Sequence, residues 1–172
     1  MMILATVGAL VCTPTLLAAT PTRVSWTGVV TYVVDGDTVH VQPPGGAKPV
    51  KIRIDGIDAP EICQAGGAVS RDVLKRQVLG QRVVVQSKVR DGYGRLVARI
   101  AMNKQDQGES LVSQGMAWSY RYRGDAGPYA MQQRQAQTAR IGMFARSYPT
   151  APVYPAEFRK KHGSCYARYR ES

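Results

Sequence analysis

The stretch Val33–Val41, which reads VVDGDTVHV, places a charged turn between two short runs of β-branched residues. Such residues favour strands, and an Asp-Gly pair between two of these runs is typical of a tight turn that reverses the chain. We therefore predict that one strand ends at Asp35 and that a second strand begins at Thr38. Taken alone, the Asp-Gly-Asp sequence indicates a turn and nothing more.

Alternation of apolar and polar residues predicts further strands on both sides of this turn. Residues 26–34 form the first strand, and residues 50–54 alternate valine and isoleucine with charged residues, which predicts a third strand with one buried face. Residues 82–86 and 96–101 predict a fourth and a fifth strand, joined by a hairpin turn at residues 91–94.

Helical spacing predicts three helices around these strands. Apolar residues between Val69 and Val78 repeat at intervals of three and four, with Gly80 as a stop signal, and shorter signals predict helices at 109–114 and 127–142. The prolines beyond residue 148 predict an extended tail. The fold class is mainly β with helices (α+β), a five-stranded Greek-key barrel of the oligonucleotide-binding (OB) type with about three helices, although an α+β sandwich has a similar order.

Length and charge set the broad class of this protein. A chain of 172 residues with 44% hydrophobic residues is long enough for one globular domain. Its 23 Lys+Arg and 12 Asp+Glu give a net charge of +11, which favours the capture of polyanions. A basic protein without a nucleic-acid role has the same balance. We place a domain at 20–148 and a basic, proline-rich tail at 149–172.

Residues 1–19 carry no charged side chain and resemble an export signal that is cleaved after Ala19, although no basic residue precedes the apolar run. Pro14 interrupts this run, which argues against a membrane-spanning helix. We therefore predict a secreted or periplasmic protein without a membrane span in its mature form.

Two cysteines, Cys63 and Cys165, remain after removal of such a signal. An even pair in an exported chain favours a disulfide, and two unrelated free thiols are the alternative. The two histidines, His40 and His162, are isolated, so these residues form no zinc-ligand pattern.

Asp37 and Asp58 are the candidate metal ligands. A hard divalent cation such as Ca²⁺ prefers oxygen donors and takes about six to eight of them. Two carboxylates do not fill that shell, so we expect the backbone carbonyl of Ala59, water and a substrate phosphate to complete it.

Glu61 follows in the acidic loop Asp58-Ala59-Pro60-Glu61 and is the candidate general base, acting on a water that a metal polarises. Arg53 and Arg95 offer the fork of donors that suits a phosphoryl group. The alternative for Arg53 is an ordinary place on the polar face of its strand.

Four motifs in this order resemble the staphylococcal nuclease (thermonuclease) family over about residues 24–146. They are Val34-Asp35-Gly36-Asp37-Thr38, Arg53 with the acidic loop that follows it, Asp91-Gly92-Tyr93-Gly94-Arg95, and residues 110–117 leading to Tyr120 and Tyr122. The resemblance implies an OB-type barrel and Ca²⁺-dependent hydrolysis of DNA and RNA that leaves 3′-phosphate ends.

The resemblance also implies roles for individual residues. Asp37, Asp58 and the carbonyl of Ala59 are similar to the calcium ligands, and Arg53, Glu61 and Arg95 are similar to the catalytic residues. The substrate contacts implied are Tyr93, Tyr120 and Tyr122. We expect DNA and RNA as substrates, with single strands preferred, and a monomer for which no protein partner is inferred. The competing hypothesis is a catalytically inactive module that binds single-stranded nucleic acid.

Overall fold

A computed structural model describes residues 24–122 and 124–165. The predicted export signal at 1–19 and the last seven residues of the predicted tail lie outside these ranges. In chain order the elements are β1 (Val24–Val33), β2 (Thr38–Gln42), a 3-10 turn (Pro44–Gly46), β3 (Val50–Ile54), β4 (Ile57–Asp58), α1 (Gly67–Val78), β5 (Arg82–Arg90), β6 (Leu96–Met102), β7 (Gln105–Asp106), α2 (Gln107–Ser113), β8 (Trp118–Ser119), α3 (Ala130–Ala139), a second 3-10 turn (Gly142–Phe144) and α4 (Pro155–His162).

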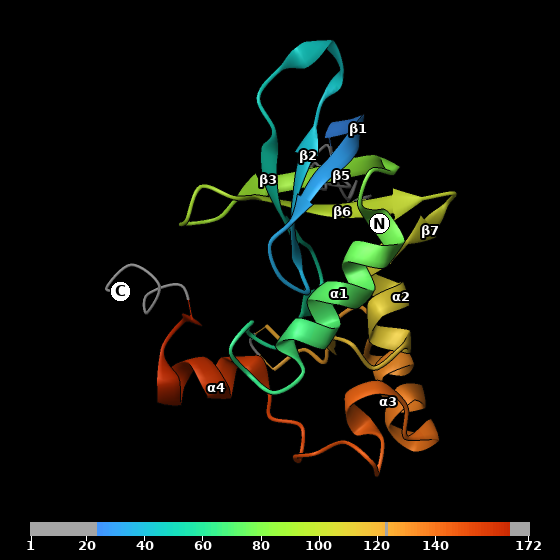
Figure 1. The fold of residues 1–172 in the computed structure, drawn as a ribbon, viewed down its shortest axis with the longest axis vertical. Helices are drawn as coiled ribbons and strands as arrows, with labels where there is room; N and C mark the ends of the chain where they lie inside the picture. The colour runs from blue at the N-terminus through green and yellow to red at the C-terminus, as the bar shows by residue number, and fades with distance from the viewer. Residues whose placement is uncertain (1–23, 123, 166–172) are drawn as a thin grey trace, which may run out of the picture.

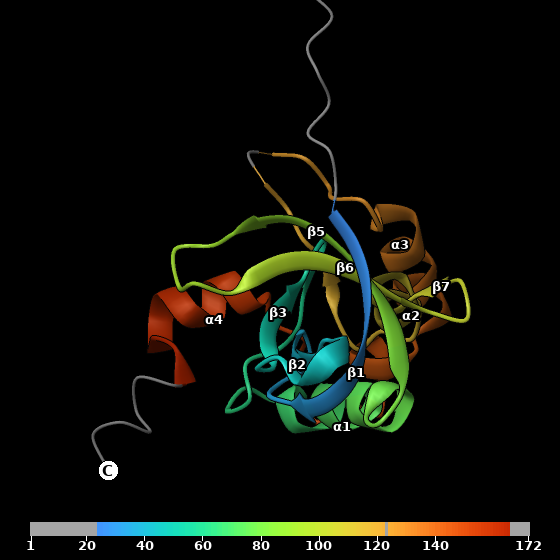
Figure 2. The same ribbon diagram turned by 90° about the horizontal axis from the view of Figure 1, so that it is seen from above.

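Five strands close into a barrel, which confirms the predicted fold class. β1 pairs antiparallel with β2 and with β5, β2 pairs with β3, and β5 pairs with β6. A parallel pairing of β3 with β6 closes the barrel. Figures 1 and 2 show the strands gathered in one part of the molecule, and Figure 1 shows the helices below them.

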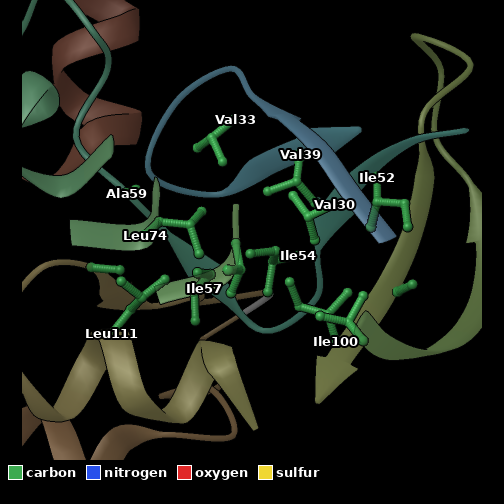
Figure 3. Packing of buried hydrophobic residues seen from close by; sticks show 14 of the residues in the cluster. Val30, Val33, Val39, Ile52, Ile54, Ile57, Ala59, Leu74, Ile100 and Leu111 are labelled. Carbon is green, nitrogen blue, oxygen red and sulfur yellow. The ribbon is translucent and has the colours of Figure 1, made fainter. Parts of the chain in front are cut away.

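Alternate residues of the barrel strands point inward and form the core. The isoleucines Ile52, Ile54 and Ile100 are almost fully buried, and Leu74 of α1 and Leu111 of α2 belong to the same cluster (Figure 3). Burying each such side chain contributes about 1.5–3 kcal/mol to folding. The apolar alternation used to predict the strands is therefore the pattern that fills the barrel.

The helices differ from prediction in length and number. α3 begins at Ala130, three residues later than predicted, because Gly127 adopts a positive φ and Pro128 follows it. It ends when Arg140 adopts the left-handed conformation. The prediction of an extended tail is wrong for residues 155–162, which form α4. Pro155 stands in the first turn of this helix, where a backbone N–H has no partner within the helix, so the missing N–H of proline costs no hydrogen bond.

Within the part of the chain that the structure describes, no helix has the length and apolar character needed to cross a membrane.

The segment before α4 packs against the barrel domain. Tyr154 donates its hydroxyl hydrogen to the carbonyl of Ser119 at 3.0 Å, and its ring packs against Trp118 with centroids 5.1 Å apart. These contacts place α4 next to the acidic loop described below.

Candidate active site

The turn between β1 and β2 holds Asp37 in a buried position. The Asp35 carboxylate accepts the backbone N–H of Asp37 at 3.0 Å, and Val34 N–H bonds to the carbonyl of Thr38 at 2.9 Å. Gly36 is required here, because a Cβ at this position would collide with Ser70 of α1. The turn is therefore both the reversal predicted from sequence and a rigid support for a carboxylate.

Asp37 is also bonded directly to the second acidic loop. Its Oδ1 accepts the hydroxyl of Thr38 at 2.9 Å, and its Oδ2 accepts the backbone N–H of Ala59 at 2.9 Å. The second of these bonds joins two loops 22 residues apart in sequence. It places the backbone N–H of Ala59 beside the Asp37 carboxylate.

Arg53 of β3 brings the two predicted metal ligands together. Its Nη2 lies 3.2 Å from Asp37 Oδ2 and 3.1 Å from Asp58 Oδ1, while its Nη1 donates to the carbonyls of Ile54 and Ile57. Both carboxylates therefore lie within hydrogen-bonding distance of one nitrogen. The structure thus places Arg53 inside the site and excludes an ordinary position on a solvated strand face.

Burial and neighbouring charges shift the pKa values of Asp58 and Arg53 in opposite directions. Burial raises the pKa of Asp58 above its ordinary value, although hydrogen bonding to Arg159 and the charge of Arg53 pull it down. Burial would lower the pKa of Arg53, but the charges of Asp37 and Asp58 outweigh it and raise the pKa. The arginine therefore stays protonated, and it offsets part of the cost of a buried carboxylate.

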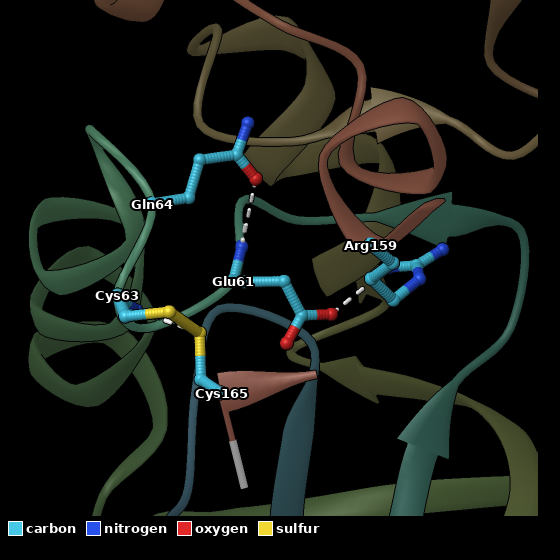
Figure 4. The surroundings of a disulfide bond; sticks show 5 residues. All are labelled: Glu61, Cys63, Gln64, Arg159 and Cys165. Carbon is cyan, nitrogen blue, oxygen red and sulfur yellow. Dashed lines mark hydrogen bonds and ion pairs between the residues drawn. A yellow bond between two sulfur atoms is a disulfide. The ribbon is translucent and has the colours of Figure 1, made fainter. Parts of the chain in front are cut away.

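Glu61 ends the acidic loop and points toward the same region. Its backbone N–H donates to Gln64 Oε1 at 3.1 Å, and its Oε1 accepts Arg159 Nη1 at 3.0 Å (Figure 4). The side chain is only 13% exposed. Sequence position had placed Glu61 on the loop, and the structure shows that its carboxylate turns toward the site.

Arg159 of α4 is the member of the site that sequence reasoning missed. Its Nη1 lies 3.1 Å from Asp58 Oδ1 and its Nη2 lies 3.0 Å from Asp58 Oδ2, so the guanidinium forms a bidentate contact with the carboxylate. Burial would lower its pKa, but hydrogen bonds to Asp58 and Glu61 raise it, so the guanidinium stays charged. The basic run Arg159-Lys160-Lys161 was visible, but nothing in it singled out one residue.

A disulfide joins Cys63 to Cys165, with Cα atoms 5.8 Å apart (Figure 4). Cys63 lies two residues beyond Glu61, and Cys165 lies just past the end of α4. The bond therefore fixes Cys165, just past α4, next to the acidic loop.

Arg95 contacts its own hairpin. Its Nε lies 2.8 Å from Asp91 Oδ2, and its guanidinium lies 5.3 Å from the ring centre of Tyr93. Burial would raise the pKa of Asp91, but hydrogen bonds from Arg95 outweigh this and lower it. In the β3–β6 pairing Arg53 is opposite Val97, and Arg95 directly precedes β6, two residues before Val97.

The three predicted substrate tyrosines expose their rings. Tyr93 is 87% exposed, Tyr120 41% and Tyr122 59%. Tyr120 donates its backbone N–H to Gly56 at 2.9 Å and directly follows β8, the partner of β4. Since β4 carries Asp58, the chain leading to Tyr120 starts beside the acidic loop.

The donor set suits a hard cation. In the described ranges 24–122 and 124–165, no group of three or more His, Cys, Asp or Glu is arranged to hold a metal ion. The two carboxylates that converge on Arg53 carry oxygen donors alone, which are the donors that Ca²⁺ prefers.

Comparison with known proteins shows the family of the chain. The family model described as staphylococcal nuclease homologue matches residues 51–146. Protein ParB of Escherichia coli is 32% identical over 148 residues, 80% of this chain and 82% of its own length. A micrococcal nuclease of Shigella flexneri is 31% identical, covering 83% and 87%, and an uncharacterized endonuclease of Haemophilus influenzae is 34% identical, covering 77% and 72%. With a family model over more than half of its length and relatives of this similarity, the chain belongs to the staphylococcal nuclease family, as its sequence motifs predicted.

Proposed function

We propose that this protein is a calcium-dependent nuclease that hydrolyses phosphodiester bonds in DNA and RNA, prefers single strands and leaves 3′-phosphate ends. Family membership supports a nuclease in general. The observation that carries the finer proposal is the convergence of Asp37 and Asp58 on Arg53, with Glu61 on the same loop.

In this proposal Asp37, Asp58 and the carbonyl of Ala59 hold Ca²⁺. When bound, the cation polarises a phosphoryl oxygen and makes a nearby water more acidic. Arg53 is held by two backbone carbonyls in an orientation that leaves Nη2 facing the carboxylates. It is thus prepared to donate to an oxygen that gains negative charge in the transition state.

Glu61 accepts a proton from the attacking water in the proposed reaction. The water oxygen forms a bond to phosphorus, and the bond from phosphorus to the 5′ oxygen breaks. The 5′ oxygen leaves and takes up a proton from solvent, and the phosphate stays on the 3′ side. Arg95, which directly precedes β6, the strand paired with the β3 strand of Arg53, is the second guanidinium for the phosphoryl group.

The exposed tyrosines and the basic surface support single strands as substrates. An aromatic ring stacks on an unpaired base, which contributes about 1–3 kcal/mol per base irrespective of sequence. Tyr120 and Tyr122 have exposed rings in a chain of net charge +11. A duplex has to open before its bases reach such rings.

We also propose that the protein is secreted or periplasmic. The signal-like residues 1–19 support this placement. The disulfide between Cys63 and Cys165 agrees with it, because disulfides persist in oxidising compartments.

Digestion of a single-stranded oligonucleotide tests the proposed function, with protein lacking residues 1–19. We expect cleavage in Ca²⁺, no cleavage in excess chelator, and slower cleavage of the duplex at equal salt. The new 5′ ends should accept phosphate from a polynucleotide kinase without prior dephosphorylation. Binding of the oligonucleotide without cleavage under all these conditions would instead identify an inactive binding module.

A further inference from the structure

The site contains a cation from the protein itself, the guanidinium of Arg159. Asp58 Oδ1 accepts hydrogen bonds from Arg53 Nη2 and from Arg159 Nη1, and Asp58 Oδ2 accepts one from Arg159 Nη2. A carboxylate offers about four lone-pair sites, so three of those on Asp58 are already used. Glu61 accepts from the same guanidinium.

We propose that Arg159 competes with the divalent cation for Asp58, and that the Cys63–Cys165 disulfide holds it in that competing position. The inference rests on the proposed role of Asp58 as a calcium ligand. A Ca²⁺ ion binds carboxylate oxygen directly at about 2.3–2.6 Å. A guanidinium whose nitrogens lie 3.1 Å from Oδ1 and 3.0 Å from Oδ2 of Asp58 blocks that approach and repels the ion by its charge.

Both ends of α4 are fixed, which keeps Arg159 over the site. Before the helix, Val153 accepts a hydrogen bond from Gln64 at 2.7 Å, and Tyr154 is bonded to Ser119. After the helix, Cys165 is bonded to Cys63. Figure 4 shows Arg159 and the disulfide on the two sides of Glu61. A tethered group acts at a high effective concentration, so Arg159 competes well with a free ion.

Arg159 is able to leave without unfolding of the helix. Its side chain is 34% exposed, whereas that of Asp58 is fully buried. A rotation of the arginine toward solvent therefore removes both of its hydrogen bonds to Asp58 while α4 stays in place, and it leaves only the bond from Arg53 on Oδ1. In this way Arg159 sets the Ca²⁺ concentration at which the site is loaded.

Calcium affinity in the absence of nucleic acid tests this inference, by titration calorimetry with CaCl₂. Arg159→Gln should bind Ca²⁺ tighter than wild type by about tenfold or more, which corresponds to about 1.4 kcal/mol. Lys160→Gln is the matched control, since it removes one positive charge from an exposed position of the same helix. It should change the affinity by less than about twofold, because surface charges are screened. Equal affinity of the two variants would overturn the competition.

Two further variants complete the experiment. Arg159→Lys keeps the charge but loses the fork, so its affinity should lie between those of wild type and Arg159→Gln. Joint replacement of Cys63 and Cys165 by serine should also tighten Ca²⁺ binding, and should have no such effect when Arg159 is already glutamine. An unchanged affinity in the serine variant would overturn the role of the disulfide.

The outcome stays separate from that of the proposed function. Suppose that the wild-type protein cuts DNA in Ca²⁺ but Arg159→Gln and Lys160→Gln bind the ion equally. This result would refute only the competition between Arg159 and the cation. A protein in which no variant cuts any nucleic acid refutes the nuclease instead. A loss of Ca²⁺ binding in Arg159→Gln would also refute the competition, because it would make Arg159 a support for the site.

Discussion

Arg159 donates two hydrogen bonds to Asp58 from a helix that lies 101 residues further along the chain. Asp58 is fully buried and already contacts Arg53, so the pair completes a site in which guanidinium groups balance the buried carboxylates. Each carboxylate of the acidic loop therefore has a guanidinium partner within the protein. Five measurements test this description of the site and of the parts of the fold that support it.

Glu61→Gln should abolish most of the activity and spare binding. The substitution keeps the size of the side chain but removes its ability to accept a proton. Loss of a general base reduces the rate by about 10²–10⁴. Single-turnover cleavage and oligonucleotide affinity are measured side by side, with Glu157→Gln, exposed on α4, as the control. A wild-type rate in Glu61→Gln would remove Glu61 from the mechanism.

Arg95→Lys should lower turnover more than affinity. Lysine retains the charge, but it lacks the fork of donors that follows the charge developing on the phosphoryl oxygens. The expected loss is about 10²-fold in rate, similar to the loss of one transition-state donor. Arg82→Lys, at an exposed position at the start of β5, is the control. If the loss appeared wholly in binding, Arg95 would be a substrate anchor and not a catalytic group.

Tyr120→Ala should weaken single-strand binding and reduce the preference for single strands. Loss of one stacked base costs about 1–3 kcal/mol, or about 5- to 150-fold in affinity. Tyr32→Ala is the matched control, because Tyr32 is also exposed but packs against His40 on the barrel. The measurement is the ratio of initial rates on a single strand and on its duplex. A ratio unchanged by Tyr120→Ala would contradict the stacking role.

Replacing Cys63 and Cys165 by serine should lower stability. The bond closes a loop with a sequence separation of 102, and chain entropy predicts a contribution of about 4–5 kcal/mol for such a loop. Denaturant unfolding of the variant and of wild type gives the difference directly. Mass spectrometry of non-reduced, digested protein from the exported fraction shows whether the bond forms there. Free thiols at both positions in that fraction would contradict the bond.

Asp91 should make part of the stability dependent on acid pH. Hydrogen bonds from Arg95 hold the pKa of Asp91 in the folded protein below its ordinary value of 3.8. The stability that the Asp91 carboxylate contributes is therefore present above pH 3.8 and is lost as the pH falls through the pKa of the folded state. Asp91→Asn removes the charge and should flatten this part of the stability curve. Unfolding free energies are compared between pH 5 and pH 2. A curve with the same slope in both proteins would mean that the Asp91–Arg95 pair contributes no net stability.

Much of the barrel and of the candidate site was predictable because the signals are local. A strand shows its buried face through alternation, so residues 50–54 and 96–101 were identified from their own pattern. Asp37 and Arg53 sit in or beside tight turns that the same residues encode. Their convergence then follows from the pairing of β2 with β3, in which Thr38 is opposite Arg53.

The tail shows where local signals end. Three prolines indicated an extended segment, but Pro155 begins α4. A proline is tolerated in the first turn, because the N–H that it lacks would make no hydrogen bond within the helix there. The partner of Arg95 was equally impossible to predict from the sequence. A guanidinium binds either a phosphate or a neighbouring carboxylate, and in the structure it binds Asp91.

The sequence by itself thus determined the barrel strands, the motifs of the family and the residues of the acidic loop, since each strand and each motif is a pattern within a few positions. The tertiary structure alone decided that Arg159, and not Lys160 or Lys161, reaches Asp58 and Glu61. That choice depends on the rotation of α4 about its axis, which Tyr154 and Cys165 set from its two ends. No periodicity in a helix of eight residues encodes the direction of a contact 101 residues away.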